Sequence, residues 1–153
     1  MDPYYVFKQQ IRHAFLQMNS EIEANVPNCQ FSGTTCSLVL ARGPQMVSVN
    51  AGDSRGIIVD KYGVPKQLSR DHKPDSVDES RRIIKTGGRI RPLINQSTGK
   101  EVGPARVWLP EMQAPGLAMS RSLGDYVAQS VGVSPDPGKF HPFLTLVFRD
   151  KRL

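Results

Sequence analysis

The spacing of apolar residues predicts one long helix at the start of the chain, followed by short strands. Between residues 4 and 24 apolar side chains recur every three or four positions, which is the period of an amphipathic helix. From residue 36 to 68 the apolar runs are short and are separated by turn residues, a pattern typical of antiparallel strands. We expect strands at 37–41, 45–50 and 55–59, joined as one antiparallel meander. The helical apolar positions are Tyr4, Phe7, Ile11, Ala14, Phe15, Met18 and Ile22.

A second, shorter helix is predicted after a polar segment. Pro74 and Asp75 stand near the start of the expected helix at 77–86, and Gly87 follows its end. Proline is favoured at the beginning of a helix and glycine just beyond its end.

The rest of the chain has weaker signals. Segments 89–93 and 106–109 are predicted to pair as strands, with 95–103 as a mobile connection. Residues 116–125 are expected to form a loop or short helix, and a last apolar run spans 143–148. The order of helix, strands and helix, without alternating β-α-β units, predicts an α+β fold with an antiparallel sheet.

Composition limits the class of protein. The chain has 153 residues, 39% hydrophobic and 22% charged, which is typical of one soluble globular domain. No apolar run approaches the roughly 20 residues that a membrane-spanning helix needs. The N-terminus has no basic stretch followed by an apolar one, so we expect no secretory signal and an intracellular, cytoplasmic or nuclear location.

The net charge of +6 and the pI near 9.6 raise the question of nucleic-acid binding. Aromatic residues that would stack on bases are absent from the most basic segment, and Gly87-Gly88 interrupts any long basic helix. We therefore expect a solvated, partly salt-bridged face and no nucleic-acid partner. The basic residues of this segment are Arg81, Arg82, Lys85, Arg89 and Arg91.

Candidate chemistry is sparse. The sequence has no phosphate-binding GxxxxGK[ST] loop, no GxSxG and no HExxH. Cys29 and Cys36 lack the spacing of a zinc site, so two reduced thiols are expected. Asp53 lies at a turn, where a carboxylate either caps backbone N–H groups or binds a hard divalent cation. Other acidic residues at turns are Asp71, Asp75 and Asp125, and their spacing does not show whether they converge.

Several short motifs follow one another in a specific order from about residue 32 to 137. They are Ser32-Gly33-Thr34-Thr35, Asn50-Ala51-Gly52-Asp53-Ser54-Arg55, Asp71-His72-Lys73-Pro74, Glu79 with Arg82-Ile83 and Gly87-Gly88, Arg106-Val107, and Gly116 to Asp125. This order resembles the type 2C, metal-dependent (PPM-type) protein serine/threonine phosphatases. The resemblance implies part of an α-β-β-α sandwich with antiparallel sheets over residues 1–148, with 149–153 as an irregular basic end.

The resemblance also implies a site and a reaction. Asp53 is expected to be a carboxylate at a weaker metal position beside a binuclear Mn²⁺ or Mg²⁺ centre, with Thr35 as a nearby hydroxyl. The implied reaction is attack of metal-bound water on the phosphorus of phosphoserine or phosphothreonine in a phosphorylated protein substrate.

The family resemblance also implies roles for several basic residues. Segment 85–112 matches the flap beside the family's cleft, so Arg89 and Arg91 are either substrate-facing or simply solvated. Arg106 and Arg121 are structural or substrate-side candidates. The motif residues His72 and Asp125 are expected to be structural.

Departures from the family pattern predict an impaired enzyme. The sequence contains no DGHGG turn and neither the SDG nor the DN motif. Arg149 stands where the strand at 143–146 would lead into a metal-binding aspartate, and Asp150 comes one residue late, which turns a strand side chain to the other face. We expect a truncated, catalytically impaired domain whose open sheet edges a partner chain could complete. The alternative is a non-catalytic pseudophosphatase or interaction module.

Overall fold

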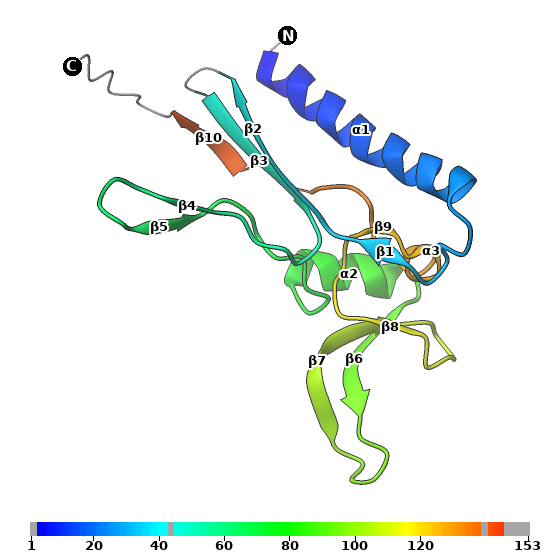
Figure 1. The fold of residues 1–153 in the computed structure, drawn as a ribbon. Helices are drawn as coiled ribbons and strands as arrows, with labels where there is room; N and C mark the ends of the chain where they lie inside the picture. Colours follow the sequence, from blue (N-terminus) through cyan, green and yellow to red (C-terminus); the bar gives the residue numbers. More distant parts are fainter. Residues whose placement is uncertain (1–2, 43–44, 139–140, 146–153) are drawn as a thin grey trace, which may run out of the picture.

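The computed structural model describes residues 3–42, 45–138 and 141–145, and it has an α+β fold, as predicted (Figure 1). A long helix, α1 (Pro3–Asn25), lies along one face of a sheet of strands β10, β3 and β2. In chain order the elements after α1 are β1 (Gly33–Thr34), β2 (Cys36–Arg42), β3 (Gln45–Ala51), β4 (Ile57–Val59), β5 (Pro65–Gln67), α2 (Val77–Lys85), β6 (Arg89–Ile94), β7 (Glu101–Trp108), β8 (Pro115–Leu117), β9 (Leu123–Gly124), α3 (Tyr126–Gln129) and β10 (His141–Thr145).

Helix α1 confirms the predicted amphipathic helix and covers the central strand. Ile11 and Phe15, one turn apart on its apolar stripe, are buried against Val47 and Val49 of β3. Residues 46–51 are all buried, because β3 is flanked by a strand on each side. Burial of this stripe positions the end of β3, where the polar turn begins.

The predicted single meander is wrong. Strand β3 pairs with β2 and β10, whereas β4 pairs with β5 in a separate hairpin. The polar turn after β3 makes its contacts with segment 69–73 instead of continuing into the sheet, through Arg55 to Asp71 and Gly52 to His72. These contacts separate β4 from β3.

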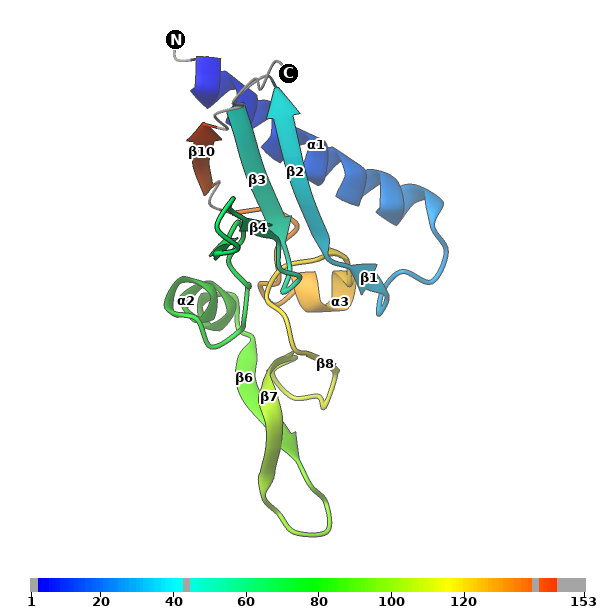
Figure 2. The ribbon, with the colours of Figure 1, turned by 60° about the vertical axis from the view of Figure 1, so that its left-hand side comes forward.

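The β6–β7 hairpin is longer than predicted and projects away from the rest of the molecule (Figure 2). The connection is shorter than the predicted 95–103, because the ladder resumes at Leu93 opposite Val102 and extends to Ile94 opposite Glu101. The Asn95 side chain accepts hydrogen bonds from the N–H groups of Ser97 and Thr98, which closes a tight turn.

A second core lies at the base of this hairpin. Ile83 of α2 packs with Val107 of β7 and with residues of and after α3, namely Ala128, Val131 and Val133. Helix α2 confirms the predicted helix at 77–86 to within one residue. The hairpin is thus anchored through α2 and α3 to the body of the protein.

Residues 116–125, predicted as a loop or short helix, contain the two short strands β8 and β9. Gly33 of β1 pairs with Gly124 of β9, whose φ is +78°. A Cβ at Gly124 would lie 2.5 Å from the carbonyl oxygen of Ser32, so only glycine permits this close pairing.

Strand β10 runs antiparallel to β3. His141 pairs with Ser48 and Thr145 with Gln45, so the described end of β10 lies at the opposite end of β3 from Asp53. The predictions for Arg149 and Asp150 lie outside the described residues. Within the described part of the chain, no helix is long and apolar enough to span a membrane.

Candidate functional site

The turn after β3 brings Asp53 beside the junction of β1 and β2. Gly52 has a φ of +114°, and a Cβ there would lie 2.3 Å from the side chain of Thr35. The Thr35 hydroxyl lies 2.6 Å from the hydroxyl of Ser54. A glycine at position 52 therefore lets the turn that contains Asp53 approach Thr35 closely, while the roles of Thr35 and Asp53 at a metal stay predictions.

The carboxylate of Asp53 already has a cationic partner. Its Oδ2 lies 2.5 Å from Nζ of Lys73, and the two side chains are 29% and 39% exposed. Arg55, two residues further on, makes a two-pronged ion pair with Asp71, with Nε to Oδ1 at 3.0 Å and Nη2 to Oδ2 at 2.8 Å. The hydrogen bond from Arg55 holds the pKa of Asp71 below its usual value.

His72 fixes the geometry of this turn. The Gly52 N–H donates to Nδ1 of His72 over 3.2 Å, and the His72 N–H donates to the Gly52 carbonyl over 3.0 Å. Burial, with the nearby Arg121 cation, lowers the pKa of His72 to about 4, so the imidazole is neutral at neutral pH and can accept at Nδ1. The expected structural role of His72 agrees with these contacts.

Glu79 of α2 forms the centre of a buried ion-pair network. Arg82 Nη2 and the Ser120 hydroxyl each donate to it over 2.7 Å, and Arg121 donates through Nη2 over 2.7 Å and through Nε. Burial alone would raise the pKa of Glu79, but the hydrogen bonds from Arg82 and Arg121 outweigh it and lower the pKa to about 2. Arg82 is therefore one of the salt-bridged residues of the predicted solvated, partly salt-bridged face, and its side chain is 29% exposed.

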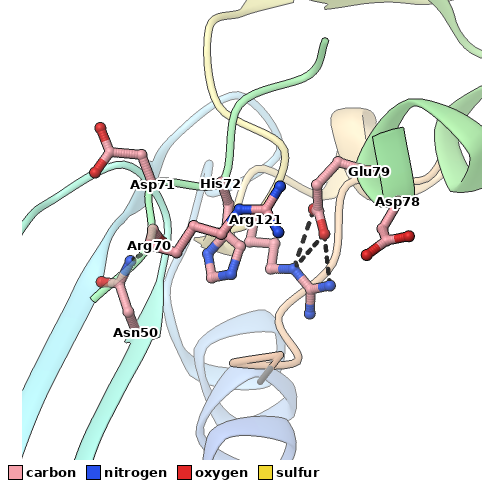
Figure 3. A pocket seen from close by; sticks show the side chains of 7 residues that line it. All are labelled: Asn50, Arg70, Asp71, His72, Asp78, Glu79 and Arg121. Atoms are coloured by element: carbon pink, nitrogen blue, oxygen red, sulfur yellow. Dashed lines mark hydrogen bonds and ion pairs between the residues drawn. The ribbon is translucent and has the colours of Figure 1, made fainter. Parts of the chain in front are cut away.

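A cavity of about 240 Å³ lies between Asn50 of β3, segment 70–72 and this network (Figure 3). In Figure 3 Glu79 and Arg121 face each other across one side, and Asn50 lies on the other. Nδ2 of Asn50 donates to the carbonyl oxygens of Gly52 and Arg70, so its Oδ1 is left buried without a hydrogen-bond partner among the described residues. The cavity has room for several water molecules. Its lining residues are Asn50, Arg70, Asp71, His72, Asp78, Glu79 and Arg121.

The candidate substrate-side arginines differ in their contacts. Arg89 donates to the carbonyl oxygens of Leu109 and Met112, and Arg106 donates to that of Gly116 over 2.7 Å. Arg89 thus ties β6 to the segment after β7, and Arg106 ties β7 to β8.

Among these arginines, Arg121 has the most side-chain partners and Arg91 the fewest. Arg121 is engaged by Glu79 and by the carbonyl of Asp136, over 2.7 Å, which favours its structural reading. Arg91 stands directly opposite Arg106 in the ladder, and the Nε atoms of both are buried without a partner in the described part of the chain.

Asp125 is buried but lies apart from the other turn carboxylates. It adopts a left-handed backbone conformation with φ 54°, and its Oδ2 has no hydrogen-bond partner within the described structure. Burial raises its pKa. A Cβ at Gly33 would overlap this carboxylate, so Asp125 fills the space under β1 and its predicted structural role agrees with its position.

The residues present do not fit a divalent metal ion. Asp53 pairs with Lys73, Asp71 pairs with Arg55, and Asp125 is buried beneath β1. Among residues 3–42, 45–138 and 141–145 no group of three His, Cys, Asp or Glu side chains could hold a metal. Divalent cations of this kind take about six oxygen ligands, more than Asp53 with a nearby hydroxyl supplies. Cys29 and Cys36 are both free, as predicted.

Sequence reasoning did not assign roles to Lys73, Arg55 and Glu79. Lys73 and Glu79 lie in motifs that were recognised, and their charges were the available signal. Their partners, Asp53, Asp71 and Arg121, are 16 to 42 residues away, and pattern reasoning does not predict such pairings.

Comparison with known proteins identifies the family. The family model described as "Protein phosphatase 2C" matches residues 3–140, so the chain belongs to the protein phosphatase 2C family. A rice (Oryza sativa subsp. japonica) relative, "Probable protein phosphatase 2C 12", is 39% identical over 86% of this chain and 34% of its own length. An Arabidopsis thaliana relative, "Probable protein phosphatase 2C 6", is 37% identical over 88% of this chain and 27% of its own. The chain thus spans about a third of the length of these relatives.

Solved structures confirm the fold. The crystal structure of a serine-threonine phosphatase 2C from Toxoplasma gondii superposes with a TM-score of 0.73 and 21% identity, covering 93% of this chain and 48% of that one. A structure described as a C. elegans sex determining protein gives a TM-score of 0.69 and 24% identity, covering 95% of this chain and 33% of that one. The chain is therefore a fragment of the PPM-type fold.

Proposed function

We propose that this chain is the central part of a metal-dependent protein serine/threonine phosphatase, a hydrolase of phosphoserine and phosphothreonine esters in intracellular proteins. The observation that carries the proposal is the family match over residues 3–140. The contact between Thr35 and the turn that contains Asp53 supports it, because these are the segments that the family resemblance places beside the reaction centre.

The flap supplies the best candidate for substrate contact. Arg89, Arg106 and Arg121 each donate hydrogen bonds to other groups of the protein. Arg91 and Arg106 stand opposite each other, each with a buried Nε that has no partner among the described residues, an arrangement of like charges that costs free energy unless an anion lies nearby. Arg106 still donates through Nη1 to the Gly116 carbonyl, which leaves Arg91 as the better candidate. A guanidinium group binds phosphate strongly, so we propose that Arg91 faces the phosphorylated protein.

A metal-dependent reaction needs ligands beyond those described. The family is metal-dependent, and we propose Mn²⁺ or Mg²⁺ as its ion. The residues described do not form a set that could hold either ion, and we derive no step through one. We therefore propose that these 153 residues by themselves hydrolyse phosphate esters very slowly or not at all.

A non-catalytic role is the second candidate. The observation that favours it is the ion pair of Asp53 with Lys73, which occupies the only carboxylate that the resemblance assigns to a metal. Strand β2 is an edge of the described sheet, with Leu38 and Val39 39% and 49% exposed. That a partner chain adds strands at such an edge stays a prediction.

The test is phosphate release by the purified 153-residue chain, with p-nitrophenyl phosphate and a phosphothreonine peptide as substrates, with and without millimolar Mn²⁺. We expect no Mn²⁺-dependent turnover above the Asp53→Ala control. Turnover that requires Mn²⁺ and is lost in Asp53→Ala would show that these residues form a working site, and the proposed impairment would be wrong. An Arg91→Ala variant of an active form would then be expected to raise KM for the peptide more than for p-nitrophenyl phosphate.

A further inference from the structure

We propose that Arg91 and Arg106 together bind a phosphate dianion on the protein substrate, at a site separate from the turn that follows β3. The inference rests on the proposed function for the class of substrate, a phosphorylated protein. It adds that the substrate carries an anchoring phosphate besides the one that is hydrolysed. The inference concerns binding and not turnover, so the two proposals can fail separately.

The two arginines face each other across the β6–β7 hairpin. Arg91 is the direct ladder partner of Arg106, so their side chains lie on the same face of the hairpin, with Cβ atoms about 4.5–5.5 Å apart. The adjacent ladder pair, Ile90 and Val107, points to the opposite face, where Val107 is buried in the second core and Ile90 packs against that core. The core therefore holds the hairpin so that both guanidinium groups stand on its other face.

Both cationic groups lack an anion among the described residues. Their Nε atoms are buried without a hydrogen-bond partner. Arg106 donates through Nη1 to the Gly116 carbonyl over 2.7 Å, whereas the Arg91 side chain makes no hydrogen bond or ion pair within the described part of the chain. Like charges directly opposite each other destabilise a ladder, and a buried donor without a partner costs further free energy. A bound anion would remove both costs.

The charge and the donors of this pair fit a phosphate group better than a carboxylate. Two guanidinium groups supply two positive charges. A phosphate monoester carries about 1.5 to 2 negative charges at pH 7 and has three acceptor oxygens. The carboxylate of an aspartate or glutamate carries one charge and has two oxygens. Guanidinium groups also form paired, charge-assisted hydrogen bonds with phosphate, so a phosphorylated residue can engage both arginines at once.

The site is separate from the turn after β3. Arg106 contacts Gly116, and four residues further along the chain the Ser120 N–H donates to the carbonyl of His72, which is hydrogen-bonded to that turn. Four residues of extended chain span at most about 14 Å. In Figures 1 and 2 the β6–β7 hairpin extends away from the end of β3. A substrate peptide covers such a distance with about four residues, so we expect the anchoring phosphate within roughly four positions of the hydrolysed one.

The only tryptophan of the chain, Trp108, lies beside this site and can report on it. It is two residues from Arg106 on the same strand, and therefore on the same face of the hairpin. Its Nε1 donates to the carbonyl oxygen of Arg91 over 2.8 Å. Because a bound dianion changes the electric field at the indole ring, the fluorescence of Trp108 should respond to binding.

The experiment is a titration of the 153-residue chain with one synthetic peptide, in a phosphoserine form and an unphosphorylated form, and with inorganic phosphate. Trp108 fluorescence gives the Kd, and the backbone amide shifts of the ¹⁵N-labelled chain locate the bound group. We expect the phosphopeptide to bind at least about tenfold more tightly than the unphosphorylated peptide or inorganic phosphate, since charge-assisted bonds favour the phosphate and the peptide adds contacts. The shifts should occur at residues 89–91 and 106–108.

Arg91→Gln tests the site without removing a side-chain contact from the fold. It should weaken phosphopeptide binding at least about tenfold. Because it relieves one of two facing like charges, it should also unfold at no lower temperature than the wild type. Arg81→Gln is the matched control: it removes the same charge from a side chain that is 74% exposed, and it should change the Kd by less than about twofold.

Three results would overturn the inference. The first is a Kd for the phosphopeptide equal to that of the unphosphorylated peptide or of inorganic phosphate. The second is the wild-type Kd in Arg91→Gln, with the amide spectrum of the native fold retained. The third is a set of amide shifts at residues 52–54 and 72 without shifts in the hairpin, because the phosphate would then bind at the turn. None of these results depends on whether the chain hydrolyses phosphate esters.

Discussion

Two carboxylates of this chain, Glu79 and Asp53, both pair with cations, but their surroundings differ. The Glu79 side chain is 7% exposed and receives donors from Arg82, Arg121 and Ser120. The Asp53 side chain is 29% exposed, and the ion pair with Lys73 is the interaction recorded for it. A saturated, buried carboxylate holds a fold together, because any loss leaves buried cations without a partner.

A carboxylate with one partner and access to solvent has the opposite properties. Its partner can leave at small cost, and its lone pairs are then free for a ligand. The comparison predicts that Glu79 contributes strongly to stability and that Asp53 contributes little. The four predictions that follow run from the largest expected effect on stability to the smallest.

Removing the Glu79 carboxylate should have the largest effect. Glu79→Ala removes the shared anion of the partly exposed Arg82 and of the more deeply buried Arg121, which keeps only Asp136 at 3.7 Å, and we expect a loss of about 3–5 kcal/mol in the free energy of unfolding. The measurement is urea denaturation followed by circular dichroism. Asp78→Asn, one residue away on α2 with a side chain 56% exposed, is the matched control and should cost less than about 1 kcal/mol. Equal losses in both variants would contradict the structural role of Glu79.

Asn19, a buried but uncharged residue with several hydrogen bonds, tests whether burial stabilises the fold without an ion pair. Asn19 of α1 is 7% exposed; its Oδ1 accepts from the Gly124 N–H over 2.9 Å and from Nε2 of Gln129 over 3.0 Å. Asn19→Ala leaves these donors unpaired, so we expect a loss of about 1–3 kcal/mol in chemical denaturation.

The control for this variant lies on the same helix. Asn25→Ala removes an exposed bond to the Glu21 carbonyl and should cost less than about 0.5 kcal/mol. If Asn19→Ala is as mild as Asn25→Ala, burial and saturation do not explain stability in this chain.

Acidification tests His72, which links the two regions. Its pKa is lowered from 6.5 to about 4 in the fold, so the unfolded chain takes up a proton first as the pH falls. Stability is therefore fully present above pH 6.5 and is lost progressively down to about pH 4. Between pH 7 and pH 5 we expect a loss of up to about 2 kcal/mol in the free energy of unfolding.

His72→Asn isolates this contribution. The amide oxygen can accept from the Gly52 N–H in place of Nδ1, but it does not titrate. Urea denaturation at pH 7 and pH 5 should give a smaller difference in the variant than in the wild type. Asp125, whose raised pKa contributes with the opposite sign, is present in both proteins. An unchanged pH dependence in His72→Asn would assign the effect to another group.

The sequence predicted most of the elements and fewer of the contacts. Periodicity identified α1 and α2, because apolar spacing and the flanking Pro74 and Gly87 are local signals. The meander prediction was wrong, because the partner of β4 depends on contacts of Arg55 that lie 16 residues away.

In the candidate site, too, local features could be predicted from the sequence and contacts between distant segments could not. The position of Asp53 at a turn and its closeness to Thr35 follow from motif order, and Gly52 makes the approach possible. The pairing of Asp53 with Lys73 does not follow from either motif, since it depends on how His72 orients its segment on Gly52. Local patterns do not encode such orientations.

The smallest effect on stability is expected at Asp53. A large effect there would contradict the contrast between Asp53 and Glu79. Asp53→Asn keeps the shape of the side chain and removes one half-exposed ion pair, so we expect a loss of no more than about 1 kcal/mol in the free energy of unfolding. Lys73→Met should cost a similar amount, and the double variant should cost less than the sum by about 0.2–1 kcal/mol, since both single changes break the same contact. Chemical denaturation of the four proteins gives this coupling energy directly. A coupling of several kcal/mol would show that Asp53 and Lys73 form a rigid structural pair like that of Glu79 and Arg121, and the contrast between the two carboxylates would then be wrong.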